Sequence, residues 1–178
     1  MTHEDRLIKQ IKNGNREYLD ELIELYYPAI LRYCLWHMPD RESAQDATQE
    51  TFLKLVRFID HYEHRGQFRA FLYRIAANTC IDMMRNTSMS ERMMDLESES
   101  DCYIHAASYV EQGFSTVEDK QQLAAAYTGL DNVQRELLLL RYGQELTMRE
   151  ISVVTGLPLR TAQTKLRRTL KQMREVLK

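Results

Sequence analysis

Breakers of regular structure are rare in this sequence, and most of them stand where an amphipathic stretch would have to end. The chain has 178 residues but only six glycines and three prolines. Between them run long segments in which apolar residues recur every three or four positions, which is the spacing of one helix face. The sequence therefore predicts an all-α protein.

The clearest local pattern runs from Leu146 to Lys178. Thr147 is a good helix N-cap, and Glu150 follows it at the spacing of a capping box. Gly156 can end this short helix in the left-handed conformation, and Pro158 suits the first turn of a longer one. The buried stripe of the longer helix is predicted to hold Ala162, Leu166, Leu170 or Thr169, Met173 and Leu177. Together these features predict a helix-turn-helix.

The longer helix is strongly basic, although the whole chain carries a net charge of −2. Residues 157–178 hold seven Lys or Arg side chains and one Glu. Most of the cations, with Gln and Thr among them, fall opposite the apolar stripe. Lys and Arg bind phosphates, while Gln, Thr and Arg can read base edges. A solvated face would explain most basic helices, but the capped helix and glycine turn in front of this one favour DNA binding.

The first ninety residues predict four helices. The first spans residues 2–13 and is closed by Gly14, and the second follows Asn15 as its cap. Pro28 should bend the second helix without ending it, because the apolar pattern continues on both sides. A third helix over about residues 42–60 has a polar, acidic outer face. A fourth, over about residues 67–88, offers aromatic rings beside arginines, which suits either single-stranded nucleic acid or plain core packing.

Residues 91–119 differ from the rest of the chain. They contain eight acidic residues and one arginine, with little apolar periodicity. This composition predicts a flexible acidic linker. A second helical unit follows, with expected helices over residues 117–127 and 130–142 before the helix-turn-helix. The predicted organisation is two small helical domains, residues 1–90 and 116–178, joined by a linker over residues 91–115.

Signals for catalysis or metal binding are poor. We find no phosphate-cradling glycine loop, nucleophile elbow or paired-carboxylate site, so we expect no enzyme activity and no cofactor. Cys102 and His105, like His61 and His64, have ligand-like spacing, but a zinc site normally needs four ligands brought together. An odd number of cysteines, no long apolar run and no secretory signal favour a reducing cytoplasm.

Three blocks of the sequence resemble a sigma factor of bacterial RNA polymerase, of the small extracytoplasmic-function (ECF) group. The motif Asp46-x-x-Gln49-Glu50-Thr51-Phe52-Leu53 resembles the core-binding helix of that family. Residues 68–78, FRAFLYRIAAN, followed by Ile81-Asp82 and Arg85, resemble its promoter-melting and −10 helix. Residues 146–174 resemble its −35 helix-turn-helix. The likeness leaves only the linker uncovered.

The resemblance implies a role for each block. The clamp helices of the polymerase's largest subunit would bind Asp46, Gln49, Glu50, Phe52 and Leu53. The non-template strand of the −10 element would be bound by Tyr62, His64, Arg65, Gln67, Arg69, Tyr73, Arg74, Asn78 and Arg85, with residues 62–67 as the loop that captures a flipped base. The −35 element would be bound by Arg160, Thr161, Gln163, Thr164, Lys165, Arg167, Arg168 and Lys171.

The resemblance also implies partners. These are core RNA polymerase, through the clamp helices and the flap of the second-largest subunit, and promoter DNA. A membrane-anchored anti-sigma factor would hold the protein inactive at the inner face of the membrane, for a stress or envelope-response regulon. Phe71 stands where tryptophan is common in the family, and Gln163 where lysine is often found, so the promoter sequence does not follow from the likeness.

Two other functions compete with this interpretation. A one-component or response-type regulator would use the C-terminal unit on duplex DNA without polymerase. A helical adaptor or anti-regulator would have no DNA role and no salt-dependent DNA binding. Neither gives the N-terminal blocks a function that matches their motifs, so the sequence favours a sigma factor.

Overall fold

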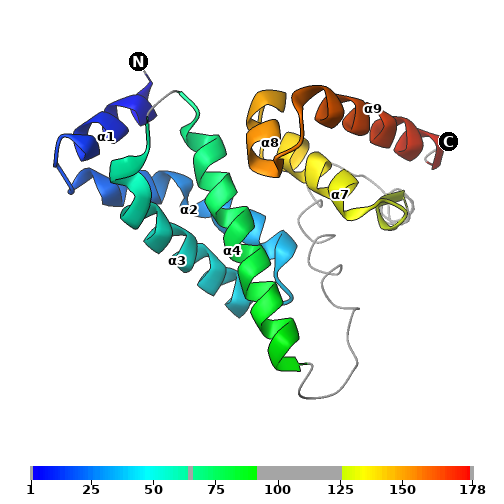
Figure 1. Ribbon diagram of the computed structural model, residues 1–178, viewed down its shortest axis with the longest axis horizontal. Helices are drawn as coiled ribbons and strands as arrows, with labels where there is room; N and C mark the ends of the chain where they lie inside the picture. Colours follow the sequence, from blue (N-terminus) through cyan, green and yellow to red (C-terminus); the bar gives the residue numbers. More distant parts are fainter. Residues whose placement is uncertain (1, 64–65, 92–125, 177–178) are drawn as a thin grey trace, which may run out of the picture. The chain divides into compact units, whose positions relative to one another are not determined.

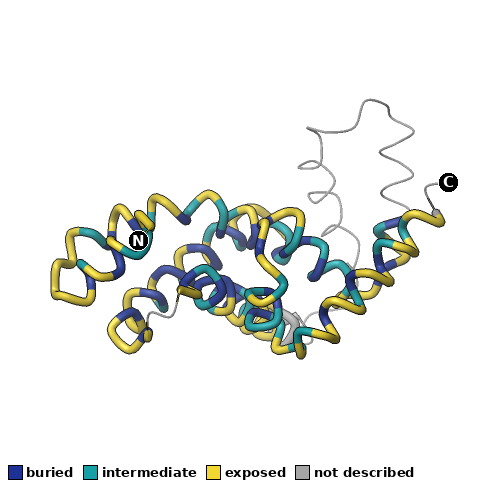
Figure 2. The backbone as a smooth tube through the Cα atoms, turned by 90° about the horizontal axis from the view of Figure 1, so that it is seen from above, coloured by how far each residue is buried: buried dark blue, intermediate teal, exposed yellow. Residues whose placement is uncertain are grey.

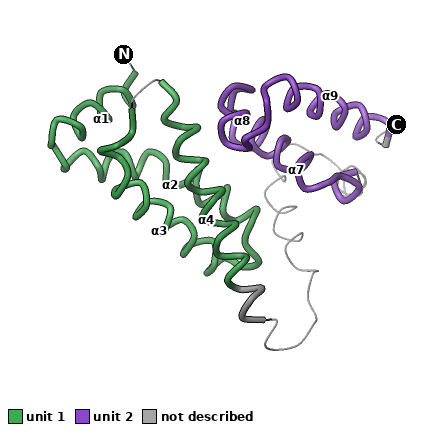
Figure 3. The backbone as a smooth tube through the Cα atoms, in the orientation of Figure 1, with its two compact units in different colours: residues 1–102 green, residues 103–178 purple. Residues whose placement is uncertain are grey.

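The computed structural model describes residues 2–63, 66–91 and 126–176, and every regular element in these ranges is a helix. The all-α prediction is therefore confirmed. The chain divides into two compact units, residues 1–102 and 103–178 (Figure 3). The predicted linker, residues 91–115, lies outside the described residues except for Glu91, and so does most of the helix expected over residues 117–127.

The described residues of the first unit form four α-helices and one short 3₁₀ turn (Figure 1). They are α1 (His3–Lys12), α2 (Tyr18–His37), α3 (Arg41–Phe58), the 3₁₀ turn η1 (Ile59–His61) and α4 (Phe68–Glu91). Helix α2 packs against α1, α3 and α4, and α3 also packs against α4. One face of each helix is buried between its neighbours, while the opposite face is exposed (Figure 2).

Short polar side chains begin two of these helices. Thr2 and Asp5 form a capping box at the start of α1, and the Asp40 carboxylate accepts a hydrogen bond from the Ser43 N–H at the start of α3. Asn15, expected to cap α2, instead donates its side-chain amide to Gln10 Oε1 at 2.6 Å. Because Asn15 stays with the preceding turn, α2 begins only at Tyr18.

Pro28 lies inside α2, and the helix continues past it to His37, as the apolar pattern predicted. The side chain is exposed, so the proline stands on the solvent side of the helix. Water can hydrogen-bond the carbonyl that loses its N–H partner there, which is why the break in the ladder is tolerated.

The second unit contains α7 (Asn132–Leu138), the π-helical turn η2 (Leu139–Gly143), α8 (Met148–Thr155) and α9 (Leu159–Val176). One regular helix was predicted over residues 130–142, and this is wrong in its second half. The π turn brings the Leu139 side chain over position 143, where an added Cβ would lie 3.0 Å from Leu139 Cδ1. Glycine at 143 leaves room for this wide turn.

The helix-turn-helix forms as the sequence predicted. Thr147 and Glu150 make the capping box of α8, and Gly156 ends that helix in the left-handed conformation with φ 72°. Ser152 Oγ donates to the Leu157 carbonyl at 2.6 Å, which fixes the turn after Gly156. Pro158 stands just before α9 and accepts a hydrogen bond from the Ala162 N–H.

Candidate protein and nucleic-acid interfaces

Helix α9 presents polar and cationic side chains along its outer face. Ala162, Leu166 and Thr169 are buried on the inner face, and Thr169 takes the place that Leu170 could have filled. The Thr169 hydroxyl donates to the Lys165 carbonyl at 2.9 Å, so its burial leaves no unpaired donor. Of the eight residues predicted to bind the −35 element, only Lys165 is half-buried. The other seven are exposed: Arg160, Thr161, Gln163, Thr164, Arg167, Arg168 and Lys171.

The cations of α9 are largely available for a ligand. Lys171 lies 3.9 Å from Glu175, and both side chains are well exposed. A surface pair at this separation is weak and is screened by salt. A basic face with amide and hydroxyl groups at its N-terminal end, after a tight turn, can place side chains in a major groove while its flanks contact phosphates.

Helix α3 presents a mixed acidic and apolar face, which we call the α3 face. Asp46, Gln49, Glu50 and Leu53 lie three or four positions apart and so share one side of the helix. Asp46 and Gln49 are exposed, Glu50 is half-buried, and Leu53 is 54% exposed. An exposed leucine beside two carboxylates is suited to a basic protein surface that also offers apolar contact.

The fifth residue predicted for this interface points elsewhere. Phe52 is 5% exposed and stacks on Tyr27, with ring centroids 6.0 Å apart. It therefore packs between α3 and α2, and its part in any interface is to hold α3 in place. The motif did not reveal this, because it gives the order of the residues but not the side of the helix on which each one falls.

Helix α4 and the residue just before it carry a second set of polar side chains, which we call the −10 face: Gln67, Arg69, Arg74, Asn78 and Arg85. Arg74, Asn78 and Arg85 are exposed and follow one line along the helix, with the exposed Ile81 between the last two. Arg69 is half-buried, and Gln67 is exposed just before the helix begins. Cations and an amide in one line can follow the phosphates and base edges of a single strand.

Two aromatic residues predicted for this surface lie in the core instead. Tyr73 is 1% exposed and meets Tyr33 edge to face. Tyr62 is 8% exposed and stacks on Phe71 with centroids 4.7 Å apart. Their rings are not available for stacking on bases here, so core packing is the better interpretation of both. His64 and Arg65 lie outside the described residues.

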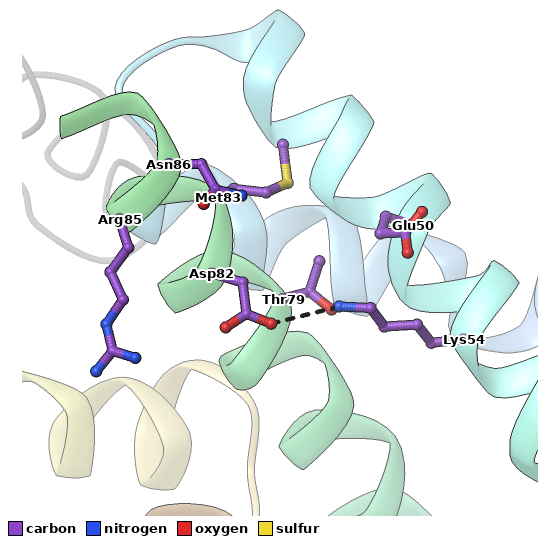
Figure 4. A pocket seen from close by; sticks show the side chains of 7 residues that line it. All are labelled: Glu50, Lys54, Thr79, Asp82, Met83, Arg85 and Asn86. Carbon is purple, nitrogen blue, oxygen red and sulfur yellow. Dashed lines mark hydrogen bonds and ion pairs between the residues drawn. The ribbon is translucent and has the colours of Figure 1, made fainter. Parts of the chain in front are cut away.

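A shallow surface pocket of about 430 Å³ separates the α3 face from the C-terminal half of the −10 face (Figure 4). Lys54 of α3 reaches across it, with Nζ 3.2 Å from Thr79 Oγ1 and 3.6 Å from Asp82 Oδ2. Glu50 and Arg85 line the same pocket. Lys54 belongs to none of the sequence motifs, and only the pairing of α3 with α4 reveals its contact.

The described residues include no group of His, Cys, Asp and Glu side chains that could hold a metal ion. His64, Cys102 and His105, which belonged to the two ligand-like pairs, lie outside those residues. Cys34 and Cys80 are buried, reduced cysteines on α2 and α4, with their sulfur atoms 3.8 Å apart. The hydrogen bond from Cys80 lowers the pKa of the Cys34 thiol, against the opposing effect of burial.

Comparison with known protein families gives two matches, in the same order as the two units. Residues 22–89 match Sigma-70 region 2, and residues 120–173 match Sigma-70, region 4. The first match contains α3 and α4 with their polar faces. The second contains the helix-turn-helix.

Individual proteins are similar over most of the chain. The ECF RNA polymerase sigma factor SigW of Bacillus subtilis is 25% identical, over 96% of this chain and 95% of its own. The ECF sigma factor SigM of the same organism is 27% identical over 78% of this chain and 82% of its own.

Two solved structures share the fold. CnrH in complex with the cytosolic domain of CnrY gives a TM-score of 0.67 at 19% identity and covers 96% of this chain and 94% of that one. The sigma factor RpoE of Bartonella quintana, solved with the anti-sigma factor NepR, gives the same score and identity over 91% and 97%. No helix in the described parts of the chain combines the length and apolar character needed to span a bilayer.

Proposed function

The chain belongs to the sigma-70 family and, within it, to the ECF group, and we propose that its two units divide the work of transcription initiation. A sigma factor binds core RNA polymerase and directs it to promoter DNA. The observation that carries the assignment is the order of the two family regions on one chain, with region 2 over residues 22–89 and region 4 over residues 120–173. We take the domains to be residues 1–90 and 116–178, with the segment between them as a linker.

We assign core polymerase binding to the α3 face. Its carboxylates suit the basic clamp helices of the largest subunit, and charge complementarity of this kind speeds association and excludes wrong partners. Leu53, more than half exposed, adds apolar contact at the C-terminal end of the face. Phe52 supports the face from behind.

We assign the non-template strand of the −10 element to the −10 face. Arg69, Arg74 and Arg85 would neutralise phosphates, while Gln67 and Asn78 would hydrogen-bond base edges. Tyr62 and Tyr73 enter this proposal as packing residues that orient the face. The face lies one helix away from the α3 face, so polymerase binding and strand binding would use opposite sides of the Lys54 pocket.

We assign the −35 element to α9. Arg160, Gln163 and Thr164 lie near the N-terminus of the helix, the part that normally reaches bases, so they would read the sequence. Lys165, Arg167, Arg168 and Lys171 would chiefly contact phosphates, and Thr161 lies beside them. Each lost base contact should cost about 1–3 kcal/mol at one promoter position.

We further propose that an anti-sigma factor holds the protein inactive until a stress signal releases it. A protein of the same fold was solved with its anti-sigma factor NepR, which supports this expectation. The exposed acidic and apolar α3 face and the basic α9 are the surfaces that such an inhibitor would cover. Because core polymerase and the chromosome are cytoplasmic in bacteria, we place the active protein there, as an initiation factor and not an enzyme.

The test is run-off transcription with purified core polymerase over a promoter library, with mapping of start sites. We expect transcripts that begin a fixed distance downstream of paired −35 and −10 elements. Tight duplex binding with no effect on polymerase would instead favour the one-component regulator. No salt-dependent binding to DNA, and none to polymerase, would favour the adaptor.

A further inference from the structure

The N-terminal helix is tied to a segment about fifty residues further along the chain. Lys12, the last residue of α1, donates its ammonium to the carbonyl oxygen of Tyr62. Arg16, in the turn that follows α1, forms an ion pair with Asp60. We call residues 60–62 the exit segment, because the chain leaves α3 and η1 through it. Neither cation was given a role by the sequence motifs.

The exit segment is held by α4 as well. The Tyr62 ring stacks on Phe71 and meets Phe68 edge to face, and both phenylalanines lie in the first turn and a half of α4. Tyr62 is therefore clamped on two sides, with its carbonyl bonded to α1 and its ring packed on α4. Beyond it the −10 face begins at Gln67.

A second contact ties α1 to the same aromatic cluster. The Tyr26 hydroxyl donates to the Glu4 carboxylate, and the Tyr26 ring meets Phe68 edge to face at 5.5 Å. Burial, followed by the bond to Glu4, raises the pKa of Tyr26, so this phenol keeps its proton and remains a donor at every physiological pH. Helix α1 is thus linked to the first residues of α4 in two ways, through the exit segment and through the Tyr26 ring, and both links end on Phe68.

We propose that Lys12 and Arg16 are positioning residues for the −10 strand: they fix the exit segment against α1 so that the start of the −10 face is held in place before single-stranded DNA arrives. This rests on the proposed function of that face. A preformed site loses less conformational entropy on binding, and a hydrogen bond to a base weakens when its donor and acceptor are poorly aligned. Loss of the two contacts should therefore relax recognition of bases more than it weakens the fold.

The geometry favours positioning over stability as the role of these contacts. The side chains of Arg16 and Asp60 are 48% and 50% exposed, and exposed ion pairs of this kind add little to folding. Lys12 donates at the end of a 3₁₀ turn, where carbonyls lack partners within the helix. The Arg16–Asp60 pair lies at the surface and the Lys12–Tyr62 bond is partly buried. Both fix the direction of the backbone in the exit segment, whereas the core of the unit is built from the buried apolar faces of α1, α2, α3 and α4.

The chain supplies a matched control. Lys9 is exposed on the same helix and carries the same charge, and it lies one turn before Lys12. If α1 acted only by attracting DNA through its net positive charge, removal of Lys9 would have the same effect as removal of Lys12. If specific contacts position the exit segment, only Lys12 and Arg16 matter.

The experiment uses full-length protein with core RNA polymerase and a promoter library randomised over the −10 element at a constant −35 element. The variants are Lys12→Ala, Arg16→Asp, Lys9→Ala and the charge exchange Arg16→Asp with Asp60→Arg. Base preference across the −10 element, total transcription, co-purification with core polymerase and thermal unfolding are measured for each. We expect Lys12→Ala and Arg16→Asp each to reduce the preference for the favoured base, at the most selective position of the −10 element, by about tenfold. The loss of one base contact has an effect of this size.

We expect Lys9→Ala to keep the wild-type base preference in the −10 element, and the charge exchange to restore it. Core binding and the unfolding temperature of all variants should stay near those of the wild type. The inference is overturned if Lys12→Ala and Arg16→Asp keep the wild-type preference, if they lower all promoters equally, or if Lys9→Ala matches them. A wild-type protein with no preference at all in the −10 element would instead refute the proposed function of the −10 face, and the inference with it.

Discussion

Tyr33 and Tyr73 meet edge to face in the core of the first unit, with ring centroids 5.5 Å apart and planes at 86°. Both are among the largest fully buried side chains in the described part of the chain. The pair joins α2 to α4 and, with the other buried side chains of α4, holds one side of that helix against the core. This orientation decides which α4 residues face outward as the −10 face.

Replacement of Tyr73 by alanine should destabilise the protein by about 3–5 kcal/mol, because it leaves a cavity where a buried ring was. Tyr73→Phe keeps the ring and removes only the hydroxyl, so its cost should stay within about 1 kcal/mol. Chemical denaturation of both variants measures this difference. If Tyr73→Phe instead abolished −10 preference while the fold stayed intact, a direct role for the hydroxyl in strand binding would return.

Reversal of charge on the α3 face should remove binding to core polymerase. Asp46→Lys with Glu50→Lys turns an acidic face basic and sets like charges against the clamp helices. We expect loss of co-purification at physiological salt without loss of helical content by circular dichroism. The matched control is Asp20→Lys with Glu24→Lys, which makes the same charge change on exposed positions of α2. Equal loss in both pairs would mean that net charge matters and the α3 face does not.

Two single substitutions on α9 should distinguish side chains that contact bases from side chains that contact phosphates. Gln163→Ala should relax preference at one position of the −35 element, with a cost of about 1–3 kcal/mol there. Arg168→Ala should weaken all promoters alike and lower the salt dependence of binding by about one unit of slope. Transcription over a −35 library at several salt concentrations checks both. The opposite result would reverse the division of this helix into base-reading and phosphate-binding residues.

The turn of the helix-turn-helix depends on glycine at position 156. Its φ of 72° disfavours any residue with a Cβ, although nothing lies within 4 Å of where that atom would be. Gly156→Ala should therefore cost about 1–2 kcal/mol from backbone strain alone. Gly156→Asn should cost less, because asparagine tolerates this conformation. Thermal unfolding of the two variants tests the ordering, and equal stability of alanine and wild type would contradict it.

Local chemistry made much of this fold predictable. Thr147 with Glu150 and Gly156 define helix ends by hydrogen bonds and backbone preference within a few residues, so the sequence alone identifies the helix-turn-helix. The π turn after Leu138 was missed because it depends on how Leu139 fits over Gly143, and apolar spacing cannot distinguish that arrangement from a regular helix. Asn15 was misassigned because its side-chain amide donates back to Gln10, which keeps Asn15 in the turn that follows α1.

The polar faces were less predictable than the helices that carry them. Tyr62, Tyr73 and Phe52 belong to motifs whose other members are exposed, and burial depends on the rotation of each helix against its neighbours. Lys12 and Arg16 gave no signal at all, since their partners lie 50 and 44 positions away. Contacts between distant segments are set by packing, and a single sequence does not record them.

The paired thiols of Cys34 and Cys80 provide a built-in reporter on this packing. Both are buried between α2 and α4, so an alkylating reagent can reach them only when those helices separate. In a Cys102→Ser background they are the only thiols in the chain. Their rate of labelling then measures the free energy of local opening in the intact protein. Slower labelling in the presence of core polymerase or −10 strand would show how much each ligand tightens the unit that binds it, without any probe being attached to the binding surfaces.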